Sequence, residues 1–564
     1  MDRFWLKSYP PGVPADIDPS VYPTIVSLLE ESFQKFRDRK AYVCMDKAIT
    51  FGELDALSNA LAAWLQGRGL KKGARVAIMM PNVLQYPVAV AAVLRAGFVA
   101  VNVNPLYTAR ELEHQLGDSG AEAVIVLENF ASTLQQALAG GKHPIQHIVV
   151  AAMGDLMGFP KGLIVNFVVR RLRKMVPAWS LPGHTPFKAA ISTGRSMGYA
   201  RPKLQPDDVA VLQYTGGTTG VAKGATLLHR TIVANLLASE AWMQPGLKRK
   251  QLSGQFTIVC ALPLYHVFAF ITCGLLGMRT GALNILIPNP RDMKGTVAEL
   301  AKYRINIFPG VNTLFNGLAN QPDFARLDFS QLAISNGGGM AVQEAVAKKW
   351  LAITGCPIVE GYGLSETSAG VTCNPTDSEA YTGSIGLPLP NVEIRILDDQ
   401  GQDVPMGEAG EIAIRGPQVM QGYWQRADET ALVMTPDGFF KSGDIGEMDA
   451  RGYIRIVDRK KDMIVVSGFK VFPNEIEAVV ANHPGVLECA VVGVPDKASG
   501  EAVTLFVVRK DPALTKEALA AYCAEQFTGY KRPKIIEFRD DLPKTNVGKI
   551  LRRELRDSVL KKVA

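Results

Sequence analysis

The hydrophobic pattern of residues 25–260 alternates between helical and strand-like spacing. Apolar residues recur at helical spacing in Thr50–Arg68 and Tyr86–Gly97, whereas short β-rich runs occupy Arg75–Met80, Ala123–Leu127 and Ile148–Ala151. Alternation of this kind is typical of parallel sheets covered by helices. The pattern therefore predicts an α/β fold with helix-flanked sheets.

The pattern changes after Gly383, where short strands are separated by Gly and Pro turns. The runs Val392–Leu397, Gly410–Arg415 and Gly452–Val457 predict a smaller, mainly antiparallel β unit. Beyond Asp458 the order strand, helix, strand, strand, helix predicts a compact α+β domain of about 100 residues. We therefore expect a domain boundary at 458–462.

Length and composition agree with a multidomain globular protein. The chain has 564 residues, of which 47% are hydrophobic and 20% charged, so it can bury a large interior and form two or more domains. Its seven cysteines are scattered without a C-x-x-C pair, which argues against a disulfide framework and a zinc site. The first 23 residues lack the apolar stretch of a secretory signal. We expect an intracellular protein in a reducing compartment.

The positive charge is concentrated at the C-terminal end. The net charge is +7, and residues 531–564 contain 11 basic and 5 acidic side chains, a surplus of 11 − 5 = 6. Such an end can attract nucleic acid, an anionic membrane or a polyphosphate substrate, or be a solvated basic helix. Charge alone does not choose among these.

Two segments have membrane-like patterns. Thr257–Met278 contains no Asp, Glu, Lys or Arg, but Pro263 and His266 interrupt it, and a spanning helix needs about 20 residues. We interpret it as a strand, a turn and a buried helix. In Leu163–Trp179 a helix can place apolar and basic side chains together, namely Leu163, Ile164, Phe167, Val168 and Leu172 with Arg170, Arg171, Arg173 and Lys174. This predicts a helix lying on a membrane, with an ordinary surface helix or connector as the alternative.

Residues 214–224 have the composition of a phosphate-binding loop. Glycines let successive backbone N–H groups face one anion, hydroxyls add donors, and a lysine supplies a positive charge. The spacing of a Walker A loop is absent, as is G-x-G-x-x-G. The candidate nucleotide-binding residues here are Tyr214, Thr215, Gly216, Gly217, Thr218, Thr219, Gly220 and Lys223.

A second segment, 360–367, combines carboxylates, an aromatic ring and glycines. Glu366 suits Mg²⁺ ligation, and the ring of Tyr362 can stack on a purine. Just upstream, a glycine triplet offers bare backbone that a flat ring can approach closely. The further candidates in this region are Gly338, Gly339, Glu360, Gly361 and Gly363.

Three more motifs lie outside these two segments. Asp444 can accept hydrogen bonds from ribose hydroxyls, and Arg459 can donate to the same sugar. Lys549 lies on a Gly-containing loop, although a single lysine is usually a solvated surface residue. Residues 194–198 match G-x-S-x-G, but no β-rich run precedes them, as a nucleophile elbow requires. We interpret 194–198 as a loop.

In this order, the motifs resemble those of the acyl-adenylate-forming superfamily of acyl-CoA synthetases, luciferases and nonribosomal-peptide adenylation domains. Asn102–Tyr107, Ala261–His266 and Asp437–Lys461 are further similar to bacterial long-chain fatty-acid–CoA ligases, and the last resembles their fatty-acid signature. The resemblance covers essentially the whole chain. Ser365 and Ser442 stand where the family often has Thr, and both keep the hydroxyl.

The resemblance implies a large N-terminal AMP-binding domain, 1–458, with two helix-flanked sheets and a small β-barrel-like part at about 383–458. A small mobile α+β domain, 459–564, follows. It also implies residue roles: a phosphate loop with Thr215, Thr218 and Lys223; Mg²⁺ on Thr215 and Glu366; adenine on Tyr362 and Gly338; ribose on Asp444 and Arg459. By the same resemblance Lys549 is the adenylation lysine and Lys461 the hinge, and Gly468 and Lys470 belong to the acyl or CoA site. His266 and Phe268 either line the acyl tunnel or belong to the core.

The implied reaction activates a fatty acid with ATP-Mg²⁺ to acyl-AMP and pyrophosphate, and then forms acyl-CoA for fatty-acid degradation. The implied partners are fatty acid, ATP and coenzyme A, without nucleic acid. A cytoplasmic enzyme associated peripherally with the inner membrane surface is expected, and the family suggests a homodimer. The alternatives are delivery to a carrier protein, a luciferase-type oxygenase, and a lipid-uptake protein without catalysis.

Overall fold

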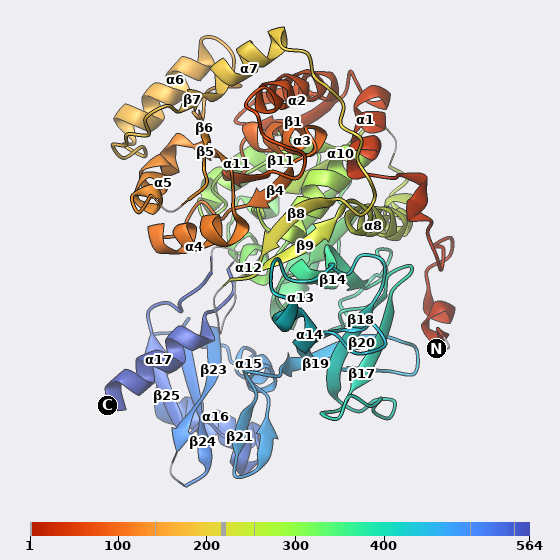
Figure 1. The fold of residues 1–564 in the computed structure, drawn as a ribbon. Coiled ribbons are helices and arrows are strands. Elements are labelled where there is room, and N and C mark those ends of the chain that lie inside the picture. The colour runs from red at the N-terminus through yellow and green to blue at the C-terminus, as the bar shows by residue number, and fades with distance from the viewer. Residues whose placement is uncertain are drawn as a thin grey trace.

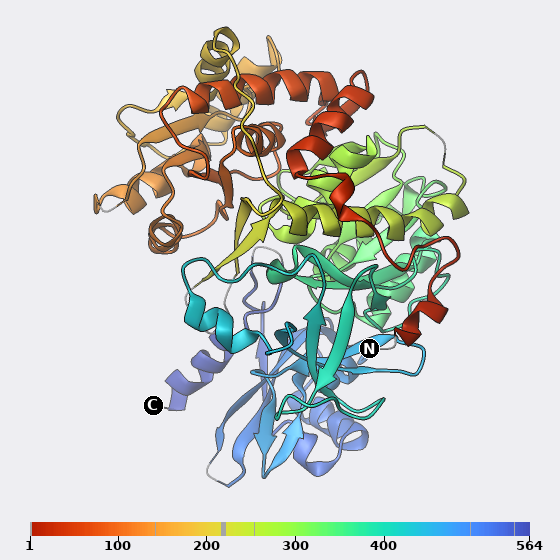
Figure 2. The same cartoon turned by 45° about the vertical axis from the view of Figure 1, so that its right-hand side comes forward.

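The computed structural model describes residues 3–141, 143–215, 222–252, 254–496, 498–545 and 548–563. It has a large N-terminal domain built on two sheets, a small antiparallel sheet, and a smaller C-terminal domain (Figure 1). The expected mixed α/β fold is therefore confirmed. Figure 2 shows the C-terminal domain (blue) and the small sheet (teal) on the same side of the two large sheets.

The larger sheet has nine strands and is parallel through its centre. In spatial order these are β16 (Leu387–Pro388), β15 (Ala369–Cys373), β14 (Ile358–Leu364), β13 (Ile334–Gly337), β12 (Ile307–Gly310), β10 (Thr257–Cys260), β11 (Leu283–Leu286), β1 (Lys40–Cys44) and β2 (Lys47–Thr50). The residues after β10 and β13 and within β14 therefore meet at one edge of the sheet, where polar side chains can gather.

The second sheet has seven strands, in the order β7 (Thr185–Pro186), β6 (His147–Ala151), β5 (Ala123–Leu127), β3 (Arg75–Met79), β4 (Val99–Asn102), β8 (Val209–Tyr214) and β9 (Gly224–Leu228). Its central strands are buried on both faces. Val76 and Ile78 join the main core, whereas Ala77 and Met79 join a second core on the opposite face. This is why 76–80 is a continuous apolar run in the sequence.

Helices cover both large sheets (Figure 1). α2 (Phe51–Gln66) begins with a capping box, in which Thr50 and Glu53 exchange hydrogen bonds. The other long helices are α1 (Ile25–Lys35), α3 (Gln85–Arg95), α4 (Ala109–Ser119), α5 (Ala131–Leu138), α7 (Phe187–Ser196), α8 (His229–Arg249), α11 (Met293–Leu300), α12 (Asn312–Ala319) and α13 (Glu344–Thr354).

The small sheet consists of β17 (Glu393–Leu397), β18 (Gly410–Arg415), β19 (Phe440–Met448) and β20 (Ile454–Arg459), all antiparallel. The N-terminal segment packs against it. Trp5 is buried so closely over Gly452 that a Cβ there would lie 2.2 Å from that of Trp5, and the Ser8 hydroxyl donates to the Arg451 carbonyl at 2.8 Å. Residues far apart in the chain thus form one unit.

The C-terminal domain is a sheet of β21 (Ile464–Val466), β22 (Phe469–Val471), β23 (Val486–Asp496), β24 (Gly500–Arg509) and β25 (Ile535–Arg539) with three helices. Alternate residues of β23 and β24 enter two separate cores, one with Val491 and Leu505 and the other with Val492 and Phe506. The helices are α15 (Pro473–Val480), α16 (Lys516–Gln526) and α17 (Arg552–Val563). The expected order of strand, helix, strand, strand and helix is present, and the structure adds β22, β25 and α17 to it.

The membrane-like segments have distinct structures. Thr257–Met278 forms β10, a turn and the buried helical segments α9 (Val267–Ala269), η5 (Phe270–Leu275) and α10 (Leu276–Thr280), as expected. Within the described ranges, no helix is both long and apolar enough to cross a bilayer. The segment 161–172 forms α6 (Lys161–Phe167) and one π-helical turn, η4 (Val168–Leu172), on the outside of the molecule.

The structure of 194–198, the segment that matches G-x-S-x-G, differs from the loop expected there. Its first three residues are not a loop but the last turn of α7, where the Ser196 hydroxyl donates to the Thr193 carbonyl at 2.8 Å. Gly194 is required by packing, since a Cβ there would lie 1.9 Å from the Ala60 carbonyl oxygen of α2. The glycine therefore serves helix contact, and the segment is no nucleophile elbow.

Candidate active site

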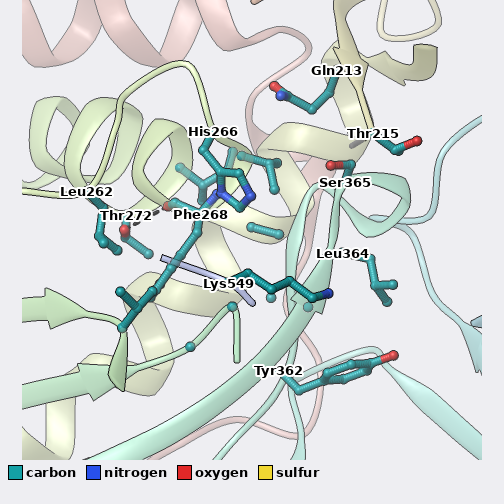
Figure 3. A pocket seen from close by; sticks show the side chains of 18 of the residues that line it. Gln213, Thr215, Leu262, His266, Phe268, Thr272, Tyr362, Leu364, Ser365 and Lys549 are labelled. Atoms are coloured by element: carbon teal, nitrogen blue, oxygen red, sulfur yellow. Dashed lines mark hydrogen bonds between the residues drawn. The ribbon is translucent and has the colours of Figure 1, made fainter. Parts of the chain in front are cut away.

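One cavity of about 1240 Å³ lies where the three parts of the molecule meet. Polar side chains from the two large sheets and from β19 and β20 line it, together with residues of the C-terminal domain (Figure 3). Of the candidate residues, it brings together Tyr214, Thr215, His266, Phe268, Gly338, Gly339, Gly361, Tyr362, Gly363, Glu366, Asp444, Arg459, Lys461 and Lys549.

The candidate phosphate loop connects β8 to β9. The Thr215 N–H donates to the Lys223 carbonyl at 2.9 Å and closes the loop's base, and Gly216, Gly217, Thr218, Thr219 and Gly220 lie outside the described residues. Tyr214 is fixed by a 2.7 Å hydrogen bond from its hydroxyl to Asp118 on α4. Thr215 faces the cavity.

Lys223 does not line the cavity. Its ammonium forms a 2.5 Å ion pair with Glu429 of α14 (Ala427–Val433) and lies 5.1 Å from the ring centre of Tyr423. Arg426, just before this helix, pairs with Asp118 at 2.7 Å, the same carboxylate that accepts from Tyr214. One network thus holds both ends of the loop and the segment 422–430.

Glu366 is a buried carboxylate at the cavity wall, in the 3₁₀ turn η7 (Ser365–Thr367). The Tyr423 hydroxyl donates to its Oε1 at 2.9 Å, and burial raises the pKa of Glu366 above its ordinary value. In the described part of the chain no three or more His, Cys, Asp and Glu side chains are grouped as a metal site. This donor set suits Mg²⁺, which is commonly bound by one or two carboxylates together with substrate phosphates.

Tyr362, Asp444 and Arg459 form a connected group. Asp444 and Arg459 are directly opposite each other on β19 and β20, and their side chains approach to 3.3 Å. The Tyr362 hydroxyl, from β14, donates to the other oxygen of Asp444 at 2.7 Å. An aromatic ring is thereby held beside a carboxylate and a guanidinium, the groups that can stack on a base and bind a sugar.

Glycines keep this side of the cavity open. At Gly338 an added Cβ would lie 3.0 Å from the ring of Phe268, and at Gly363 it would lie 1.8 Å from the Ala369 carbonyl oxygen. Glu360, a candidate from the same segment, does not line the cavity. Its carboxylate accepts from the Val342 N–H at 2.8 Å, and burial raises its pKa to about 7. Glu360 therefore supports the end of β13.

Lys549 enters the cavity from the C-terminal domain. Figure 3 shows its side chain extending beneath His266 and Phe268 toward Leu364. Burial lowers the pKa of Lys549 to about 7, with Arg459 acting in the same direction. Burial also lowers the pKa of His266 to about 4, and the positive charge of Lys549 contributes. The positive charge of Lys549 is therefore only weakly neutralised by the surrounding side chains, as expected for a site that receives an anion.

The three remaining candidates belong to the C-terminal domain. Lys461 lines the cavity within the turn after Arg459, where the Asp462 N–H donates to the Arg459 carbonyl at 3.0 Å. Gly468 and Lys470 do not line it. They lie in the exposed hairpin of β21 and β22, and the Lys470 ammonium is 3.6 Å from Asp399.

The cavity has a polar and an apolar end. In Figure 3 Leu262 and Thr272 lie on the side away from Gln213, Thr215 and Ser365. The apolar lining comes from β10 and the turn after it, and from α8, η5, α10, β12 and β13, namely Trp242, Met243, Ile258, Leu262, Ile271, Leu276, Ile307 and Ile334. His266 and Phe268 are between the ends, so both belong to the cavity wall.

Several residues of the site were not predicted. Asn102 accepts from the Tyr86 hydroxyl at 2.6 Å and donates to Gln213 at 3.0 Å, which donates to the Tyr265 carbonyl at 3.0 Å. This chain supports the cavity wall between the sheets. Asn102 and Tyr265 belong to the motifs at 102–107 and 261–266, but nothing in those motifs indicates that the two segments are joined through Gln213. Asp118, Tyr423 and Glu429 carried no local signal either.

Comparison with known proteins covers both domains. Residues 29–424 match the AMP-binding enzyme family, and residues 475–549 match the AMP-binding enzyme C-terminal domain. The chain is 53% identical to the long-chain-fatty-acid–CoA ligase of Escherichia coli O6:H1 over 564 residues, which is 100% of this chain and 99% of that protein. Identity to the Bacillus subtilis enzyme of the same name is 36%, over 98% and 97% of the two chains.

Solved structures agree in fold. ATP-bound MatB from Rhodopseudomonas palustris superposes with a TM-score of 0.79 at 28% identity, covering 94% of this chain and 98% of that one. Apo MatB gives 0.71 over the same coverage. The anthranilate CoA ligase AuaEII with anthranoyl-AMP gives 0.82 at 25% identity, over 97% and 100%.

Proposed function

Because this chain belongs to the AMP-binding enzyme family, we propose that it is a long-chain-fatty-acid–CoA ligase that forms acyl-AMP and then acyl-CoA. The observation that carries the proposal is the single cavity that joins an apolar end to Thr215, Glu366, Asp444 and Lys549. It is supported by 53% identity to a ligase of that name over the whole chain. Neither carrier-protein delivery nor loss of catalysis is favoured by any feature of the site.

In the first half-reaction, a fatty-acid carboxylate oxygen attacks the α-phosphorus of ATP, and pyrophosphate leaves. The acyl chain occupies the apolar end, so the carboxylate lies near His266 and Lys549. Lys549 cancels charge between the two anions, while Tyr362 stacks on adenine and Asp444 binds the ribose together with Arg459. No side-chain nucleophile is needed, because the site binds both reactants in line and so makes the step effectively unimolecular.

The proposed metal, Mg²⁺, would be held by Glu366 and Thr215. When bound with ATP, it would neutralise phosphate charge beside a buried carboxylate. Lys223 would then exchange Glu429 for a phosphate oxygen. The exchange is easy, since both members of this pair are about one-third exposed.

In the second half-reaction, the CoA thiol attacks the acyl carbonyl and AMP leaves. For this step the C-terminal domain turns about Lys461, which removes Lys549 and brings the β21–β22 hairpin, with Gly468 and Lys470, toward the cavity. The position of Lys549 here fits the first half-reaction. The higher similarity to ATP-bound than to apo MatB supports that assignment.

We also propose peripheral association with a membrane, through the surface made by Phe159, Leu163, Ile164, Phe167, Leu172 and Met175. Each of these side chains is more than half exposed, with Phe159 at 87%. Residues 159–180 contain no Asp or Glu, and Lys161, Arg171, Arg173 and Lys174 flank the apolar side chains. An exposed apolar patch within a basic, acid-free segment, helical at 161–172, fits an anionic bilayer, the source of the substrate.

Arg170 is excluded from the proposed membrane-binding set. Its guanidinium is engaged by the buried Glu128, with Nε 2.9 Å from both carboxylate oxygens, so it anchors η4 to the body of the protein. The homodimer suggested by the family resemblance stays a prediction.

The experiment that tests the proposed function is release of AMP by the purified protein with ATP, Mg²⁺ and CoA, across fatty acids from short to very long. Acyl-CoA should form stoichiometrically with AMP and prefer long chains. If the protein forms acyl-AMP but transfers the acyl group only to a carrier protein and not to CoA, it is the carrier-loading enzyme and not a CoA ligase. If a folded preparation that binds ATP releases no AMP in response to fatty acid, the proposal that the protein is an active ligase is wrong.

A further inference from the structure

Asp458 is fully buried at the end of β20, three residues before Lys461. One of its carboxylate oxygens accepts from the Arg459 N–H at 2.7 Å, and the other accepts from the Asn474 N–H at 2.8 Å. Asn474 lies in the first turn of α15. A carboxylate of the N-terminal domain is therefore bonded to the backbone of the C-terminal domain, across the turn that joins them.

Arg552 approaches the same carboxylate from a second element of the C-terminal domain. It begins α17, three residues after Lys549, and its Nη1 is 3.6 Å from Asp458 Oδ1. The guanidinium also donates to Glu477 at 2.7 Å, to Asp462 at 3.1 Å and to the Asn474 side chain at 2.5 Å. Its planar fork holds these partners in fixed directions, which an ammonium cannot do.

These contacts differ in what a domain rotation would do to them. Asp462, Glu477 and Asn474 follow Lys461 in the chain and would move with Arg552. Asp458 precedes Lys461 and would stay with β20 and the ribose-binding pair Asp444 and Arg459. The bonds to Asp458 are thus specific to the domain position in which Lys549 enters the cavity.

Separating this pair is costly. Burial raises the pKa of Asp458 to about 6, although Arg552 opposes that shift, so the carboxylate is ionised at neutral pH inside the protein. A buried charge that loses its partner is strongly destabilising. Water must therefore reach Asp458 when the domain turns, and the energy of its two contacts favours the position seen here.

We propose that Asp458 is a positioning residue for adenylation, which acts through Asn474 and Arg552 to hold Lys549 in the cavity. This inference rests on the proposed function, because it assigns Asp458 to one of the two half-reactions. Asp458 does not line the cavity, so we expect its effect to be confined to the step that needs the adenylation lysine.

The test compares Asp458→Asn with Glu477→Gln. Asparagine keeps an oxygen for the Asn474 N–H but loses the charge that faces Arg552. Glu477→Gln removes an equivalent charge from the same guanidinium, yet Glu477 lies on the moving side, so its contact does not report the domain position. Fatty-acid-dependent ATP–pyrophosphate exchange measures the first half-reaction, and conversion of supplied acyl-AMP and CoA to acyl-CoA measures the second.

Asp458→Asn should lower exchange by roughly ten-fold or more, while acyl-CoA formation from acyl-AMP stays the same or rises. Glu477→Gln should change both rates by one common factor. Equal loss of both half-reactions in Asp458→Asn, or unchanged exchange, would overturn the inference. If Asp458→Asn does not fold, Arg552→Lys is compared with Glu477→Gln instead. Lysine keeps the charge but loses the fork, so the Asp458 contact weakens together with those to Asp462, Asn474 and Glu477, and exchange should still fall more than acyl-CoA formation. Wild-type protein without exchange would instead reject the proposed function.

Discussion

The Tyr423 hydroxyl donates a 2.9 Å hydrogen bond to Glu366, so the carboxylate proposed to hold Mg²⁺ is fixed by a side chain 57 residues later. Tyr423 also lies against Lys223, with the ammonium 5.1 Å from its ring centre. A single aromatic ring therefore contacts both the metal-binding candidate and the loop lysine. Mutations of Glu366 and Tyr423 can therefore distinguish the effect of the carboxylate charge from the effect of the hydrogen bond that positions it.

We expect Glu366→Gln to lower fatty-acid-dependent ATP–pyrophosphate exchange by about 100-fold or more, the effect of removing a key electrostatic group. The amide still accepts from Tyr423, so the shape is kept while the charge is lost. Tyr423→Phe, which removes only the hydrogen bond, should cost about ten-fold or less. Exchange in Glu366→Gln within a few-fold of wild type would reject the metal assignment.

The lowered pKa of Lys549, about 7, predicts a pH dependence for adenylation. The charged form is present below this pKa and is lost as the pH rises through it, so kcat/KM for ATP should fall above about pH 7. Bound phosphates favour the charged amine, so kcat should fall only at higher pH. Exchange measured from pH 6 to 9 checks both statements.

Lys549→Arg provides the control for this pH profile. A guanidinium stays charged throughout that range, so the fall should disappear even if the maximal rate is lower. Lys544→Arg, on the same loop, should leave the profile as in wild type. A fall that persists in Lys549→Arg would assign the titration to another group.

Membrane binding should require both features of the surface at 159–175. Replacing Arg171, Arg173 and Lys174 by Glu should reduce sedimentation with anionic vesicles strongly, since each basic residue near such a surface contributes about 1 kcal/mol. Replacing Leu163 and Phe167 by Ser should weaken binding in high salt as well. Leu432→Ser is the matched control, because this leucine is 69% exposed elsewhere. If both surface variants sediment with vesicles as wild type does, the surface at 159–175 does not bind membranes.

Chain-length preference should respond to Thr272. This side chain lines the cavity on the side away from Thr215, and its hydroxyl donates to the Phe268 carbonyl at 2.8 Å and lies 3.8 Å from Cys273 Sγ. Thr272→Phe should shorten the apolar end and lower kcat/KM for long chains, while short chains are affected little, since each buried CH₂ contributes about 0.8 kcal/mol. AMP release across chain lengths measures the shift. Thr272→Val, of equal size, should keep the wild-type preference.

Local patterns predicted the elements well, because they depend on nearest neighbours. Residues 76–80 are apolar and enter the cores on both faces of a central parallel strand, and the helix at 51–66 begins with the capping box of Thr50 and Glu53. The interpretation of 194–198 as a loop was wrong, since Gly194 is selected by contact with another helix. Contacts between distant segments produce no periodic pattern in the sequence, so they could not be predicted from it.

The same limit applied to the site. The family resemblance assigned Tyr362, Asp444 and Arg459 to one nucleotide, and the structure joins their side chains by a hydrogen bond and a salt bridge. The engagement of Lys223 by Glu429 joins residues 206 positions apart, and no composition rule predicts it. The position of the β21–β22 hairpin depends on the domain arrangement, which a linear pattern does not encode.

The packing of Trp5 beneath Gly452 constrains the order of events during biosynthesis. Ser8 and its acceptor Arg451 are separated by 443 residues. At about 5–20 residues per second, roughly 20 to 90 seconds pass on the ribosome between them. Throughout that interval the indole lacks its contact with Gly452, although the two large sheets can already assemble. The segment that holds Trp5 therefore completes its packing only after the turn before β20 has been translated.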